Sequence, residues 1–176
     1  VSGGPDLDHS SILHQYVKMI HSAKTSISIQ NPYFIPNKML LEALKMASLR
    51  GVDVRVMVPE EIDSKVAKYS MHSNFEELLK DGVQICIVKD KFFHSKLIIV
   101  DESIASIGSG NFDYRSFEHN YELNTIIYDE ELSKKLTEDY NTLCETSKHL
   151  NYKSYKERAL KQKLLEGMAR MFSPLL

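Results

Sequence analysis

The stretch HSKLIIVDESIASIGSGN, residues 94–111, places polar groups with catalytic potential inside strand-forming sequence. Side chains alternate between the two faces of a strand, so His94 and Lys96 should project on the same face. Asp101 should point to the opposite face. The alternation therefore separates Asp101 from the other two residues and predicts that it serves a turn or a backbone cap.

The GSGN sequence that follows puts Ser109 and Asn111 two residues apart, and its glycines let the backbone approach a ligand closely. The segments KLIIVD and SIASIG are close enough for a hairpin with Glu102 and Ser103 at the turn. In such a hairpin the end of the second strand returns beside the start of the first. We expect four polar side chains to surround one small space there: His94, Lys96, Ser109 and Asn111.

This group of side chains suits a phosphate. An ammonium from Lys96, an amide from Asn111 and a hydroxyl from Ser109 can donate hydrogen bonds to its nonbridging oxygens. A neutral imidazole can attack phosphorus directly, provided that its other nitrogen is held as N–H by an acceptor. Glu122, in the segment HNYELN, is the candidate acceptor. Such a reaction needs no metal and no cofactor, because cations and amides stabilise the transition-state charge.

Length and composition describe one ordinary domain spanning residues 1–176. The chain is 43% hydrophobic and 26% charged, as soluble globular proteins are, and its net charge is -2. A surface without a net positive field argues against a nucleic-acid partner. No segment is long enough for a transmembrane helix. Cys86 and Cys144 lack metal-type spacing, and Cys86 in VQICIV reads as a small buried residue.

The start of the chain reads as linker. Residues 1–8 begin with Val1 rather than methionine and contain the sequence VSGGPD. We therefore expect a soluble piece of a longer parent protein, and membrane segments would lie elsewhere in that parent.

Periodic patterns predict alternating helices and strands in the first half and successive strands afterwards. The expected fold is α/β, a mixed sheet with helices on both faces. A C-terminal helical tail over residues 153–176 carries an apolar stripe flanked by lysines, suited to a partner half or a membrane surface. Helices are expected at 10–23, 37–49, 64–80, 130–149 and 155–172, and strands at 25–30, 52–59, 83–88, 96–101, 103–108 and 121–128.

The segment from His94 to Glu122 resembles the HKD motif of the phospholipase D superfamily. His94, Lys96 and Asp101 match its first part, and Gly108, Ser109 and Asn111 match the Gly-Ser-x-Asn that follows. The flanking sequences QNPYFIP and SPLL are similar to the C-terminal half of bacterial cardiolipin synthases, so the likeness covers nearly the whole chain.

The resemblance implies a phosphatidyltransferase that condenses two phosphatidylglycerols to cardiolipin and glycerol. His94 would form a phosphohistidine, Lys96, Ser109 and Asn111 would bind the phosphate, and Glu122 would orient the imidazole. Asp101 belongs to the catalytic motif in this resemblance. The parent would act at the cell membrane, on its cytoplasmic face.

The family site uses two such motifs across a pseudo-twofold axis, and this chain has one. It would therefore be one half of a pseudo-dimer, completed by a second motif in the same chain or by a homodimer mate. His72, expected on a helix surface, and His119 are weak candidates for the second histidine. A phospholipase D or nuclease-type phosphodiesterase and a noncatalytic half remain alternatives.

Overall fold

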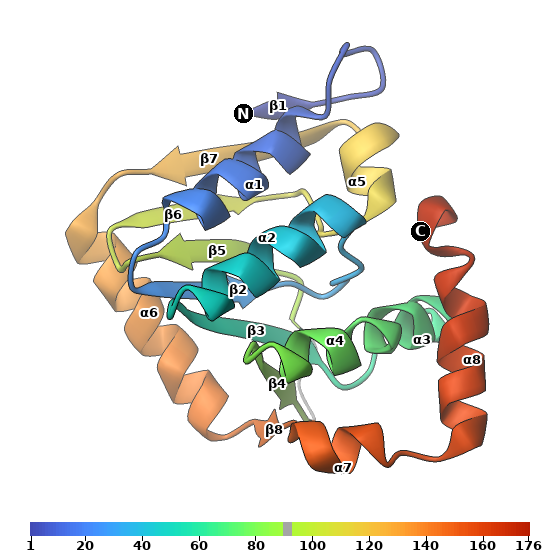
Figure 1. Ribbon diagram of the computed structural model, residues 1–176. Helices are drawn as coiled ribbons and strands as arrows, with labels where there is room; N and C mark the ends of the chain where they lie inside the picture. Colours follow the sequence, from blue (N-terminus) through green and yellow to red (C-terminus); the bar gives the residue numbers. More distant parts are fainter. Residues whose placement is uncertain (90–92) are drawn as a thin grey trace.

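The computed structural model describes residues 1–89 and 93–176, and its strands form one mixed sheet in the order β1-β7-β6-β5-β2-β3-β4-β8 (Figure 1). The central strands β2, β3 and β4 are parallel, and each remaining pair is antiparallel. The strands are β1 (Ser2–Gly3), β2 (Ser26–Gln30), β3 (Asp53–Pro59), β4 (Gln84–Val88), β5 (Lys96–Val100), β6 (Ile104–Gly108), β7 (Glu122–Ile127) and β8 (Lys148–His149).

Helices cover both faces of this sheet, which confirms the predicted fold class. On one face, the buried residues of α1 and α2, such as Ile12 and Leu44, pack with Ile29 of β2. On the other face, Tyr140 of α6 packs against Met57 of β3. The helices are α1 (Ser11–Ser22), α2 (Lys38–Leu49), α3 (Lys65–Ser73), α4 (Phe75–Lys80), α5 (Tyr114–Glu118), α6 (Glu130–Glu145), α7 (Tyr152–Lys156) and α8 (Leu160–Arg170), with a 3-10 turn η1 (Ser173–Leu175).

The predicted hairpin of β5 and β6 is present, but its turn lies one residue earlier than expected. The Ser103 amide donates to the Val100 carbonyl at 3.1 Å. Asp101 and Glu102 form the turn between them, both with positive φ, at 52° and 51°. Two successive left-handed residues match the right-handed twist of the flanking strands, which explains the one-residue shift from the predicted Glu102–Ser103.

Three long helical predictions are wrong in detail. The helix expected over 64–80 is broken at Asn74 into α3 and α4, and the one expected over 155–172 is divided into α7 and α8. The helix expected over 130–149 ends at Glu145, and β8 follows. β8 forms because the otherwise free edge of β4 supplies backbone partners, with Cys86 opposite His149.

The start of the chain is more ordered than the linker we expected. Ser2 and Gly3 pair antiparallel with β7, and the Val1 amino group donates to the Asn124 carbonyl at 2.7 Å. This edge strand lies beside the β7 residues that contribute to the candidate site.

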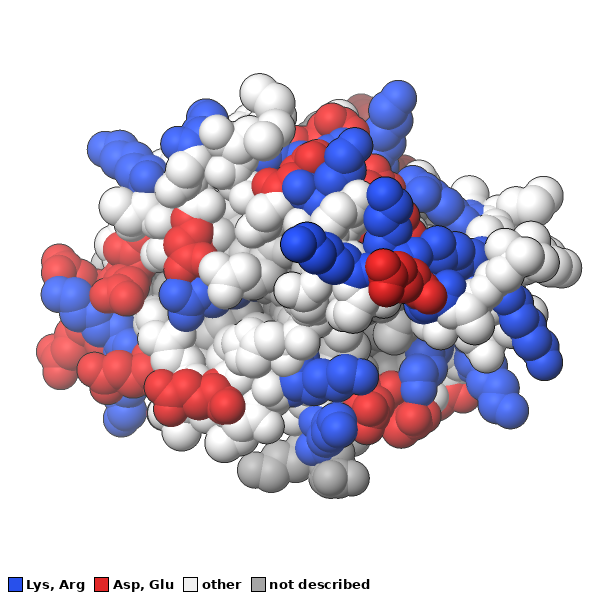
Figure 2. Space-filling view, turned by 60° about the horizontal axis from the view of Figure 1, so that its bottom comes forward, with Lys and Arg blue, Asp and Glu red and all other residues white. Residues whose placement is uncertain are grey.

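Helix α8 leaves an apolar face in solvent. Leu160, Leu164 and Met168 are 71%, 60% and 62% exposed. In Figure 2, uncharged side chains form the right-hand edge of the molecule, on the side where α8 lies in Figure 1, and lysine and arginine side chains border them. Among the helices of the described ranges, none combines the length and apolar character needed to span a membrane.

Candidate active site

The ends of three neighbouring strands bring the motif residues to one edge of the sheet. Lys96 opens β5 and pairs with Gly108, the last residue of β6, which in turn pairs with Asn124 of β7. Glu122 opens β7. The antiparallel register therefore gathers residues that are distant in the sequence, as the hairpin prediction required.

His94 and Lys96 are in direct contact. The Lys96 Nζ lies 3.0 Å from Nδ1 and 2.9 Å from Nε2 of the His94 ring, and 2.9 Å from the His94 carbonyl oxygen. Because an ammonium can only donate, the ring nitrogen that accepts from it carries no proton. This contact therefore places the imidazole of His94 directly beside a cation.

The two partners differ in burial. Lys96 is 4% exposed, whereas His94 is exposed. Burial lowers the pKa of Lys96, and the negative charges of Glu122 and Asp113 oppose this effect. The ammonium therefore sits in a partly desolvated position, where its attraction to a phosphate is stronger than in water.

Glu122 organises the loop that carries Ser109. Its carboxylate accepts hydrogen bonds from the Ser109 hydroxyl, from Ser116 Oγ at 3.2 Å and from Asn120 Nδ2 at 3.2 Å. These contacts fix the loop beside Lys96. The expected bond from the imidazole to Glu122 stays a prediction.

Asn111 belongs to the same edge and faces a cavity of about 310 Å³. Its backbone amide donates to Ser116 Oγ at 3.0 Å, and Ser116 in turn donates to Glu122. Its side-chain Oδ1 is buried and has no hydrogen-bond partner among the described residues. Tyr33 and Asp113 also line this cavity.

Sequence reasoning assigned no role to Ser116, although it links Asn111 to Glu122. Ser116 lies in α5, a helix of five residues that no periodic pattern revealed. Asp113 caps this helix by accepting from the Ser116 amide at 2.8 Å. An aspartate three residues before a serine is a capping signal that was present in the sequence.

Asp101 lies at the opposite end of β5 from Lys96. Its carboxylate accepts from the backbone amides of Lys24, Thr25 and Ser26 and from the Thr25 hydroxyl, at 2.8–3.1 Å. These hydrogen bonds lower its pKa against the effect of burial. Asp101 thus joins the β5–β6 turn to the start of β2. It lies at the end of β5 away from Lys96, whereas Ser109 and Glu122 lie at the same end of the sheet as Lys96.

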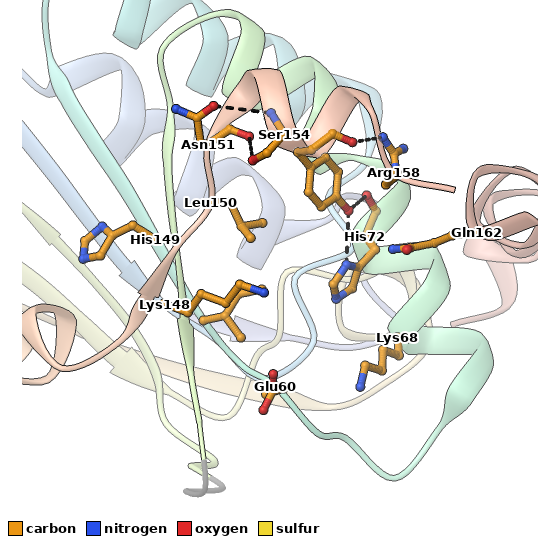
Figure 3. A pocket seen from close by; sticks show the side chains of 12 residues that line it. Glu60, Lys68, His72, Lys148, His149, Leu150, Asn151, Ser154, Arg158 and Gln162 are labelled. Carbon is orange, nitrogen blue, oxygen red and sulfur yellow. Dashed lines mark hydrogen bonds between the residues drawn. The ribbon is translucent and has the colours of Figure 1, made fainter. Parts of the chain in front are cut away.

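A second cavity, of about 470 Å³, lies between α3, β8 and α7 (Figure 3). Here His72 is half-buried rather than on the surface as predicted, and its Nδ1 lies 3.1 Å from the Tyr155 hydroxyl. Burial lowers the pKa of His72 to about 4, and neighbouring cations, Lys68 first among them, add to the effect. His72 is thus a neutral packing residue of this cavity.

Comparisons with known proteins identify the family of this chain. Residues 16–144 match the family model described as "Cardiolipin synthase, PLD-like domain". Cardiolipin synthase 1 of Staphylococcus epidermidis is 45% identical over 175 residues, which cover 99% of this chain and 36% of the relative. The major cardiolipin synthase ClsA of Bacillus subtilis is 41% identical over 176 residues, covering 100% of this chain and 36% of that protein. The chain thus spans about a third of the length of these curated relatives.

Solved structures support the fold. Nuc of Salmonella typhimurium, a phospholipase D family member, aligns with a TM-score of 0.72 at 24% identity, covering 86% of this chain and 97% of Nuc. Phosphatidylserine synthase of Haemophilus influenzae aligns with a TM-score of 0.76 at 16% identity, covering 99% of this chain and 45% of the synthase. Since the family model covers well over half of the sequence, the chain belongs to the family of cardiolipin synthase, phospholipase D-like domains.

Proposed function

We propose that this chain is one catalytic half of a phosphatidyltransferase that converts two phosphatidylglycerols to cardiolipin and glycerol. The observation that carries the proposal is the contact between the Lys96 ammonium and the His94 ring, at the sheet edge that also holds Ser109, Asn111 and Glu122. Relatives named as cardiolipin synthases align over the whole chain and indicate the substrate class.

In the proposed first step, a bare nitrogen of His94 attacks the phosphorus of one phosphatidylglycerol. The bond from phosphorus to the glycerol oxygen breaks, and glycerol leaves with a proton from a general acid. Lys96, Asn111 and Ser109 hold the nonbridging oxygens, where negative charge develops. The phosphatidyl group then rests on His94.

In the second step, the terminal hydroxyl of another phosphatidylglycerol attacks the same phosphorus. Its proton goes to the base that protonated glycerol, and the bond from phosphorus to nitrogen breaks to release cardiolipin. One phosphodiester replaces another, so the exchange needs no energy source beyond its substrates. Glu122 would hold the second imidazole nitrogen as N–H, and Asp101 would act by fixing β5 rather than by touching the substrate.

Of the two weak candidates for the acid and base in this scheme, His72 is a poor fit. His72 is hydrogen-bonded within the other cavity, and its low pKa keeps it neutral at pH 7. We therefore assign this role to a second motif-bearing half, in the same polypeptide or in a homodimer mate. This chain together with that second half is called the complete enzyme below. It would work at the cytoplasmic face of the cell membrane, where its lipid substrate lies.

We further propose that the apolar face of α8 packs against this second half. The face continues through Met171 and Leu175, which are 80% and 72% exposed, to the chain end. There the Leu176 carbonyl accepts from the Arg115 amide at 3.0 Å, directly beside the candidate site loop. The relatives are almost three times as long as this chain, so they contain further chain able to cover such a face.

The double substitution Leu164→Glu and Met168→Glu tests this packing. In the complete enzyme it should weaken association of the halves, measured by cross-linking or by protease sensitivity. Lys161→Glu, which changes a charge on the same helix, is the control. Unchanged association with lost binding to phosphatidylglycerol vesicles would instead make this face a membrane contact.

The function itself is tested by incubating the complete enzyme with phosphatidylglycerol and analysing lipids by mass spectrometry. We expect equal amounts of cardiolipin and glycerol, and at least a 1,000-fold lower rate for His94→Asn, because the nucleophile is lost. Wild-type rates with His94→Asn would refute the proposal. Plasmid cleavage without cardiolipin formation would favour a nuclease, and no activity with either substrate would favour a noncatalytic half.

A further inference from the structure

Two cysteines that are far apart in the sequence meet a histidine at the outer edge of the sheet. Cys86 lies in β4, Cys144 is in the last turn of α6, and His149 lies in β8. Cys86 is paired with His149 across the β4–β8 ladder. One potential metal-ligand atom from each of the three lies within 4.8 Å of the other two.

The hydrogen bonds of His149 fix which ring nitrogen carries a proton. Its Nε2 lies 3.0 Å from the Cys144 carbonyl oxygen, which can only accept, so Nε2 is the N–H. In the neutral tautomer with this N–H, the other nitrogen, Nδ1, is the one open to a metal ion, and it lies 3.7 Å from the Cys86 sulfur. Metal-binding histidines are commonly held in this way, with the nonligating N–H on a carbonyl.

We propose that Cys86, Cys144 and His149 form a binding site for a soft or borderline transition-metal ion, with zinc(II) as the best fit. Thiolate and imidazole are the ligands that zinc prefers in proteins. A tetrahedral zinc ion places a ligating sulfur and nitrogen roughly 3.6 Å apart. The separation between Cys86 Sγ and His149 Nδ1 matches this value without rearrangement.

Charge balance also suits the buried position. Binding one zinc(II) ion forms two bonds to sulfur and one to nitrogen, and each thiol releases its proton to solvent. The two thiolates cancel the charge of the ion, so a neutral unit is buried. Cys86 and Cys144 are 0% and 5% exposed, whereas His149 is exposed and gives the ion a route from solvent.

A buried hydroxyl without a partner supports the site independently. Tyr140 is 1% exposed and packs in the same cluster as Cys86 and Cys144. Its hydroxyl has no hydrogen-bond partner among the described residues. Buried hydroxyls are usually satisfied, so this group needs an explanation. A thiolate ligand, or a water in the fourth coordination position, would accept its hydrogen bond.

The site would join β4, α6 and β8, which the β4–β8 ladder and the apolar cluster of Cys86, Tyr140 and Cys144 already hold side by side. Figure 3 shows the His149 ring turned away from the neighbouring cavity, on the side opposite Leu150. The metal would thus stabilise the wall of that cavity without entering it. The location differs from the sheet edge of the candidate active site, so this inference does not depend on the proposed function.

The test uses the 176-residue chain, fully reduced and freed of metal, and titrates it with zinc(II) against a chromophoric chelator. We expect about one equivalent of zinc to bind. Cobalt(II) should bind in its place and give sulfur-to-cobalt charge-transfer absorption and the intense visible bands of tetrahedral coordination. His149→Gln should weaken zinc binding at least about 100-fold, since even the loss of a supporting contact costs 10–100-fold.

His149 is exposed, so its replacement should leave the fold intact, which circular dichroism checks. Cys86→Ala and Cys144→Ala provide a second set of variants, and loss of the charge-transfer band on replacing either cysteine is expected. His14→Gln is the matched control, because His14 stacks on His9 and could hold an adventitious ion. Zinc binding that survives the cysteine substitutions but falls with His14→Gln would overturn the proposal. Failure of the reduced chain to bind zinc would overturn it as well.

Discussion

The Lys96 ammonium lies 2.9 Å from the His94 carbonyl oxygen and within 3.0 Å of both nitrogens of the same residue's ring. A short segment at the start of β5 thus holds the proposed nucleophile, His94, beside a cation. A phosphate entering beside them would exchange the imidazole for its own oxygen as the partner of the ammonium. Under the proposed function, the contact would position both groups for one substrate.

Lys96→Met should lower the turnover number of the complete enzyme about 100- to 1,000-fold, the usual cost of removing one transition-state donor. The substitution keeps the length of the side chain and its apolar packing, so the fold should persist. Lys24→Met, at the other end of the sheet and exposed, is the matched control. Initial rates of cardiolipin formation measure the effect. Equal losses in both variants would show that Lys96 acts through the fold alone.

Asp101→Asn should reduce stability rather than chemistry. It replaces a charged acceptor of four donors, which we expect to cost about 1–2 kcal/mol of unfolding free energy, and asparagine tolerates the positive φ of this position. Urea denaturation of the chain measures this cost. Glu102→Gln in the same turn is the control and should stay within about 0.5 kcal/mol of wild type. Unchanged stability with a tenfold loss of enzyme activity would place Asp101 in the chemistry instead.

The alternation of side chains along a strand was a useful local signal in the sequence. It separated Lys96 from Asp101, and β5 is regular from Lys96 to Val100, with Asp101 in the turn that follows. His94 lies just before β5, outside the strand, and meets Lys96 through a side-chain contact. The family resemblance, by contrast, grouped Asp101 with the catalytic residues. Alternation is a local property of the backbone, so it can be read without knowing the neighbours of the strand.

Long-range pairing could not be predicted in the same way. β8 is two residues long, and its sequence continues the helical pattern of α6. Only the free edge of β4 makes it a strand, and only this strand brings His149 to Cys86. The spacing of the two cysteines in the sequence therefore concealed a cluster that tertiary contacts create. The five-residue α5 was missed for the related reason that its length gives no periodicity.

The chain should lose stability as the pH falls from 7 to 5, in part through His72. Its pKa of about 4 in the folded protein lies below the ordinary value of 6.5, so the unfolded state binds the proton more tightly. The stabilisation is fully present above pH 6.5 and is lost as the pH approaches 4. Between pH 7 and pH 5 this effect amounts to about 2 kcal/mol.

Urea denaturation at a series of pH values measures this dependence. His72→Gln should give a shallower decline than wild type, because it removes the group that takes up the proton. His21→Gln, which removes an exposed imidazole from α1, is the control. Parallel pH profiles for wild type and His72→Gln would contradict the burial of a neutral histidine at this position.

Gly108→Ala should destabilise the chain by about 3 kcal/mol or more. A Cβ at this position would collide with the Asn124 amide oxygen and the Leu123 carbonyl and would lie 2.7 Å from Asn124 Cα. Backbone atoms of β7 cannot move aside without breaking the β6–β7 ladder, so overpacking is costly here. The first glycine of GSGN is thus required by the approach of β7, which in turn places Glu122 beside Ser109.

Gly167→Ala is the matched control, because a Cβ there meets nothing within 4 Å and the residue lies inside α8. It should raise stability by about 0.5–1 kcal/mol through helix propensity. Thermal unfolding of both variants measures their stability relative to wild type. A Gly108→Ala protein as stable as wild type would mean that β7 does not approach β6 this closely.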